Sequence, residues 1–175
     1  MKHESKEAER RAVLAAADAM AAAARTAPKG RGLDRLETWI LDGAEKDAFV
    51  QSMREYGKEI GAEFFLRDAK NVDQATALIL FGIEEAQHGL NCGYCGKATC
   101  AEAAAEGIGC AFAMTDLGIA IGSAVSVAAD LRIDNRVMYS AGKTAIHIGT
   151  FSKKVKAAYG VPLSVSGKNV FFDRG

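Results

Sequence analysis

The sequence predicts an α+β fold, layered from helices and a sheet, within a single domain that spans residues 1–175. Three observations support this class. The composition is that of a globular protein, with 49% hydrophobic and 25% charged residues. A chain of 175 residues is long enough to bury a core of ordinary size. Segments whose apolar residues recur every three or four positions alternate with short apolar runs of strand length, so helices and strands should alternate along the chain.

The N-terminal third predicts a helix, a strand and a second helix, in that order. Residues 4–25 are dominated by Ala, Glu, Arg and Lys, which are good helix formers, and their apolar side chains share one face. Pro28 disfavours helical geometry in the residue before it, so this helix should end there. Residues 36–41 (LETWIL) then indicate a strand. Residues 44–60 carry apolar residues at helical spacing, and Gly61 is a natural stop.

The middle of the chain contains the most apolar predicted strand. Residues 64–74 are ambiguous between helix and strand. Residues 75–83 (ATALILFGI) form a continuous apolar run, which is typical of a strand buried on both faces. Residues 100–106 are long enough for one or two helical turns, and residues 110–131 predict a long buried helix. The small residues of this last helix would let another backbone approach closely, which is one of two signals for a homodimer.

The C-terminal part predicts a helix, a strand and an aromatic tail. Asp134 is a good N-cap for a helix over residues 135–149. Residues 155–163 indicate a strand. Phe171 and Phe172 of the tail should dock, because a monomer does not leave such side chains in water. A tail that wraps a neighbouring chain is the second signal for a homodimer.

Charge and hydropathy exclude several classes of partner. Lys plus Arg equals Asp plus Glu at 22 each, so no net charge attracts nucleic acid or an anionic membrane. The most apolar stretch, residues 117–129, is too short and too rich in Gly, Ser and Ala for a membrane span. The N-terminus has no secretion signal. We therefore expect a cytoplasmic protein, in which structural disulfides are improbable.

Four cysteines form the clearest candidate site. Residues 88–110 begin with HGLNCGYCGKATC and give the spacing C-x2-C-x4-C-x9-C. The thiolates of Cys92, Cys95, Cys100 and Cys110 are the ligands that a 4Fe–4S or 2Fe–2S cluster needs, and also those of a structural zinc ion. The glycines between them permit backbone conformations with φ > 0, which a loop around a cluster requires. The sequence therefore predicts a metal-binding loop directly after the buried strand.

Three alternatives to an iron–sulfur cluster stay open. Zinc ribbons prefer two C-x2-C knuckles, and this chain has one. A C-x-x-C redox pair would leave Cys100 without a role. Cys110 begins an apolar helix, where a cysteine can also serve as core filler. His88 precedes the motif by four residues. A metal ligand or a hydrogen-bond donor to a ligand is one interpretation of it, and a polar loop residue is the more frequent one.

Two resemblances extend this interpretation. Residues 25–41 (RTAPKGRGLDRLETWIL) and 116–134 (DLGIAIGSAVSVAADLRID) look like segments of flavin-dependent nitroreductases. Together with the cysteine motif and the tail at 135–174, nearly the whole chain resembles an uncharacterised prokaryotic family described as ferredoxin-domain-containing. The first resemblance implies an α+β sandwich that dimerises and binds FMN at the dimer interface. Lys29 and Arg31 are then the candidates for holding a phosphate or the flavin.

The leading hypothesis for function is an iron–sulfur redox protein that transfers electrons to or from a partner protein. The first alternative is an FMN-dependent oxidoreductase in which the cluster relays electrons to flavin. The second alternative is a zinc-stabilised interaction module without enzymatic activity. The sequence shows no catalytic triad, metalloprotease signature or Rossmann fingerprint that would indicate another reaction.

Overall fold

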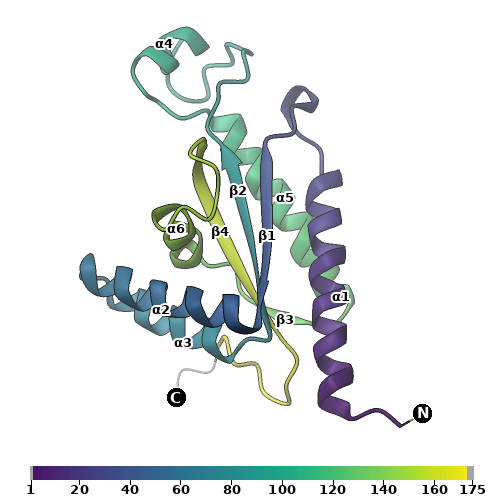
Figure 1. The fold of residues 1–175 in the computed structure, drawn as a ribbon. Coiled ribbons are helices and arrows are strands. Elements are labelled where there is room, and N and C mark those ends of the chain that lie inside the picture. Colours follow the sequence, from purple (N-terminus) through teal and green to yellow (C-terminus); the bar gives the residue numbers. More distant parts are fainter. Residues whose placement is uncertain (1, 173–175) are drawn as a thin grey trace.

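A four-stranded antiparallel sheet with helices on both faces makes up the fold, in a computed structural model that describes residues 2–172 (Figure 1). The strand order is β1-β2-β4-β3, and every neighbouring pair is antiparallel. The strands are β1 (Leu36–Asp42), β2 (Ala77–Glu84), β3 (Asp134–Asn135) and β4 (Val155–Ser164).

Five helices cover the two faces, and two short ones lie in loops. Helices α1 and α5 pack together on one face, and α2, α3 and α6 cover the other (Figure 1). The helices are α1 (Ser5–Thr26), η1 (Gly30–Gly32), α2 (Gly43–Glu59), α3 (Glu63–Gln74), α4 (Cys100–Ala105), α5 (Ala111–Asp130) and α6 (Tyr139–His147). Helix α5 has the length and apolarity of a membrane span, and its buried face packs on α1 and β2.

The central strand β2 separates two hydrophobic clusters. Ile79 and Phe81 point into the cluster beneath α1 and α5, whereas Leu78 and Leu80 point into the cluster beneath α2, α3 and α6. All seven residues from Ala77 to Ile83 are buried. This confirms the prediction of a strand covered on both faces, and the two clusters explain why its apolar run is continuous rather than alternating.

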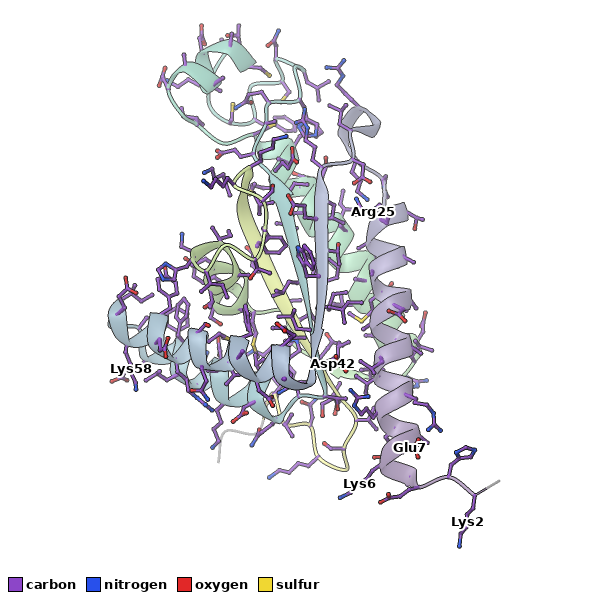
Figure 2. The ribbon with its side chains drawn as sticks, in the orientation of Figure 1. Lys2, Lys6, Glu7, Arg25, Asp42 and Lys58 are labelled. Atoms are coloured by element: carbon purple, nitrogen blue, oxygen red, sulfur yellow. The ribbon has the colours of Figure 1, made fainter. Side chains whose placement is uncertain are left out.

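Helix α1 is tied to strand β1 near both of its ends. Arg25, in its last turn, donates to the Asp34 carboxylate at 2.7 and 2.8 Å and to the Leu36 carbonyl at 2.8 Å (Figure 2). Arg10 forms an ion pair near the other end with Asp42, the last residue of β1, which Figure 2 labels. Burial raises the pKa of Asp34, but the hydrogen bonds from Arg25 and from the Leu36 N–H, together with the positive charges of Arg25 and Lys29, outweigh burial and hold that pKa below its usual value. These contacts fix the turn that follows α1.

Most predicted elements are confirmed, and the ambiguous segment 64–74 forms helix α3, with Phe65, Ala69 and Val72 on its buried face. The helix predicted over 135–149 is wrong at its start, because it begins only at Tyr139.

Asp134 is not an N-cap. It lies in β3 and pairs with Ser164 of β4, and its carboxylate accepts a hydrogen bond from Asn169 at 3.0 Å. Further along, Met138 exchanges two backbone hydrogen bonds with Gly160 at 2.8 and 3.0 Å. Pairing with β4 satisfies these backbone groups and delays the helix.

The docking predicted for the tail holds for one phenylalanine only. Phe171 is 1% exposed and belongs to the cluster beneath α2, α3 and α6. Phe172 is 60% exposed, and the Arg136 guanidinium lies 5.6 Å from its ring centroid. The last residues of the predicted tail, 173–175, lie outside the described part of the chain. Phe172 is therefore covered on one ring face by the charged side chain of Arg136 and is not buried in the core.

The architecture brings three segments together at one end of the sheet. The loop after β2, the turn η1 and the N-terminal end of α5 meet there (Figure 1). Because the sheet is antiparallel, the rule that ligands gather at the carboxyl ends of parallel strands does not explain this location.

Candidate metal centre

All four cysteines line one pocket between the loop after β2 and the start of α5. Cys92, Cys95 and Cys100 come from the loop, and Cys110 is the residue immediately before α5. Gln87, His88 and Phe112 also line the cavity. The fold therefore brings the fourth cysteine to the other three across an intervening short helix.

Local backbone geometry shapes the loop around this cavity. Gly89, Gly93 and Gly96 have φ values of 70°, 76° and 84°, a region that side chains rarely adopt. The expectation that glycine serves here for its positive φ is confirmed. The backbone N–H of Asn91 donates to Cys100 Sγ at 3.4 Å, while the Asn91 side chain accepts from the Cys100 N–H at 2.9 Å. These two contacts tie the start of the loop to the start of α4.

The thiols share the cavity without converging on one point. Cys92 is exposed, Cys95 and Cys100 are half-buried and Cys110 is buried, and all four are free. Within residues 2–172, no three His, Cys, Asp or Glu side chains lie close enough together to hold one metal ion. Binding of a single ion by these thiols would therefore require the loop to rearrange.

A buried histidine connects Cys110 to a buried aspartate. His88 Nδ1 lies 3.4 Å from Cys110 Sγ, and His88 Nε2 lies 3.0 Å from Asp116 Oδ2. Asp116 also accepts the backbone N–H of Gly30 at 2.9 and 3.1 Å. Thiol, imidazole and carboxylate thus form one hydrogen-bonded chain beside the cavity.

The interpretation of His88 as a polar loop residue is wrong, and the sequence offered one signal for its partner. Asp116 shares the buried face of α5 with Ala113, Leu117 and Ala120. An acidic residue on the apolar face of a helix needs a hydrogen-bonding partner. The pattern therefore identifies Asp116 as a buried acid that needs a partner, but it does not show that the partner is His88.

Lys29 and Arg31 are engaged within the protein. Lys29 Nζ donates to the carbonyls of Ala24, Arg25 and Ala27 at 2.6–2.7 Å. Burial lowers the pKa of Lys29 from its ordinary value. Arg31, at φ 57°, donates to the His88 carbonyl at 2.6 Å. Lys29 thus satisfies backbone carbonyls at the C-terminal end of α1, and Arg31 holds the start of the cysteine loop. That either residue binds a phosphate or flavin stays a prediction.

The fold is similar to that of solved nitroreductases and a related flavoprotein. A nitroreductase with bound FMN from Desulfitobacterium hafniense matches with a TM-score of 0.59 at 15% identity, over 95% of this chain and 81% of that one. A putative NADH dehydrogenase/NAD(P)H nitroreductase from Bacteroides thetaiotaomicron matches with a TM-score of 0.59 at 14% identity, over 95% and 77%. A BluB-like flavoprotein from Clostridium difficile matches with a TM-score of 0.57 at 16% identity, over 97% and 84%. The nitroreductase-like fold implied by the sequence is confirmed.

Sequence comparison identifies the family. Residues 106–174 match the model of an uncharacterized protein containing a ferredoxin domain (DUF2148), a range that includes Cys110 but not the other three cysteines. An uncharacterized protein from Archaeoglobus fulgidus is 42% identical over 171 residues, which is 93% of this chain and 91% of that protein. The chain therefore belongs to the family of uncharacterised proteins that contain a ferredoxin domain.

Proposed function

We propose that the protein is a small iron–sulfur redox protein, with one cluster held by Cys92, Cys95, Cys100 and Cys110, that transfers electrons to or from a partner protein. The observation that carries the proposal is the single cavity lined by all four thiols. Membership of a family described by a ferredoxin domain supports the same role. A cluster in this place would supply one-electron redox chemistry.

The residues present fit such a group in three respects. Four thiolates are the ligand set of both 2Fe–2S and 4Fe–4S clusters. The four thiolates would bind one to each iron of a 4Fe–4S cluster, or two to each iron of a 2Fe–2S cluster, so ligands spread around a cavity suit a cluster better than a single zinc ion. Two features also favour negative charge on the sulfurs: the Asn91 N–H at Cys100 and the N-terminal end of α5 at Cys110.

Anaerobic purification tests the proposal. The holoprotein should contain iron and acid-labile sulfide in comparable amounts, and its visible spectrum should bleach on reduction with dithionite. Metal analysis, sulfide analysis and spectroscopy measure these properties on one sample. A colourless protein with one zinc ion per chain, which unfolds when the zinc is chelated, would instead favour the non-enzymatic interaction module.

An FMN-dependent oxidoreductase is the second candidate, because the fold is that of a nitroreductase with bound FMN. In this case we propose a homodimer with flavin at the subunit interface. Incubation with FMN followed by gel filtration should leave flavin fluorescence in a peak whose light-scattering mass equals two chains. A one-chain mass without flavin, after reconstitution with FMN, would reject this candidate.

We also propose a cytoplasmic location, where thioredoxin and glutathione would keep the four thiols reduced and able to bind a metal centre. A redox partner would reach the centre on the exposed side of the loop. Tyr94 is exposed there and stacks on Phe112, with ring centroids 5.7 Å apart. Phe112 lines the cavity, so this pair marks the rim at which we expect the partner to dock.

A further inference from the structure

Cys110 is the most buried of the four thiols, and a buried histidine contacts its sulfur. Cys110 is 5% exposed, His88 2% and Asp116 3%. The imidazole lies between the other two side chains, with Nδ1 at 3.4 Å from the sulfur and Nε2 at 3.0 Å from the carboxylate. Each ring nitrogen thus faces one potential hydrogen-bonding partner.

The surroundings hold this imidazole from three directions. Asp116 anchors Nε2 and is itself held by the Gly30 N–H at 2.9 and 3.1 Å. Arg31 fixes the His88 backbone by donating to its carbonyl. A Cβ at Gly30 would lie 2.8 Å from His88 Cδ2, so the ring packs directly against the glycine backbone. The ring orientation is therefore set by α5 and the turn η1, not by the cysteine loop.

We propose that His88 is a positioning residue of the metal centre, which Asp116 orients so that the imidazole donates a hydrogen bond to the Cys110 sulfur. The inference rests on the proposed function, because it assumes that Cys110 is a ligand. A metal-bound thiolate has no proton to donate, so the proton between the two residues lies on Nδ1. The contact between Nε2 and the Asp116 carboxylate is a second hydrogen bond, with one proton between these two atoms.

The hydrogen bond has two consequences for the centre. It fixes the direction in which the Cys110 sulfur points, as partners behind a metal ligand commonly do. It also withdraws electron density from the sulfur and stabilises the added negative charge of a reduced centre, which raises the reduction potential. His88 thereby makes the centre easier to reduce.

Two amide variants separate the two contacts of the ring. In His88→Gln the amide can reach the place of Nε2 and keep the bond to Asp116, but nothing remains to donate to Cys110. In His88→Asn the amide occupies the place of Nδ1 and can donate to Cys110, but the bond to Asp116 is lost. The reduction potential of each anaerobically purified holoprotein is measured by redox titration followed in the visible spectrum.

His88→Gln should lower the ratio of reduced to oxidised centre at a fixed potential about tenfold, which is a shift of about 59 mV for one electron. His88→Asn should change the logarithm of the same ratio, and therefore the reduction potential, by less than half as much as His88→Gln. His147→Gln is the matched control, because His147 is a partly exposed histidine stacked on Tyr56, and it should change nothing. If His88 had a purely structural role, loss of the bond to Asp116 would matter more than loss of the bond to Cys110. His88→Asn would then show the larger shift in potential, and this result would overturn the inference.

Three further results are decisive. If His88→Gln does not retain a centre, the wild-type holoprotein labelled with ¹⁵N-histidine is studied by electron–nuclear double resonance. Coupling of the reduced centre to histidine nitrogen and to an exchangeable proton supports the inference, and absence of both overturns it. Wild-type protein without iron and sulfide overturns the proposed function together with this inference. An unchanged potential in a loaded His88→Gln protein overturns the inference alone.

Discussion

Single Cys→Ala substitutions at Cys92, Cys95, Cys100 and Cys110 are each expected to reduce the iron retained per chain by about tenfold or more. Loss of a residue behind a metal ligand already costs about 10–100-fold in metal affinity, and loss of a ligand should cost at least as much. Iron and sulfide are measured after anaerobic gel filtration. Ala98→Ser, at an exposed position of the same loop, is the control and should retain the full iron content.

Stability of the metal-free protein separates ligation from packing. Cys92 is exposed, so Cys92→Ala should change the free energy of unfolding by less than about 0.5 kcal/mol. Cys110 is buried, so Cys110→Ala should cost about 1 kcal/mol in the same measurement. A Cys92→Ala protein with full iron content would remove Cys92 from the ligand set. Full iron content in Cys110→Ala would leave Cys110 with only its packing role.

Gly142→Ala is expected to give the largest loss of stability, about 3 kcal/mol. A Cβ at this position would lie 1.9 Å from the Ala158 carbonyl oxygen and 2.4 Å from the Tyr159 nitrogen. Both atoms belong to the backbone of β4, so no side chain can move aside and α6 would have to retreat from the sheet. Such a loss is a large fraction of the about 5–15 kcal/mol that stabilises most domains. Denaturant unfolding of the metal-free protein measures it.

Gly118→Ala is the matched control, because Gly118 also lies inside a helix but a Cβ there meets no atom within 4 Å. Alanine favours helix over glycine by about 1 kcal/mol, so this variant should be slightly more stable than the wild type. Equal unfolding midpoints for Gly142→Ala and the wild type would show that α6 does not approach β4 as closely as described.

Sequence patterns of short range predicted most of the fold. The apolar run at 75–83 identified the central strand, since burial on both faces leaves no polar positions. Helical spacing located α1, α2 and α5 within a few residues of their bounds. The pattern did not distinguish helix from strand at 64–74, where exposed Phe64 and Leu66 flank the buried Phe65. The residues of this segment that are buried are fixed by the packing of α3 against α2, α6 and β4, which the pattern does not contain.

The sequence by itself determined the class of the fold, the family and the four-thiol motif, because each depends on residue types at short spacing. Only the tertiary structure decided which distant groups meet. Asp134 became a strand residue because β4 satisfied its backbone. His88 and Asp116 are 28 positions apart, and Gly30 is 86 positions from Asp116, yet the three form one hydrogen-bonded cluster. Such pairings arise when helices and loops pack around a common sheet, and no local periodicity encodes them.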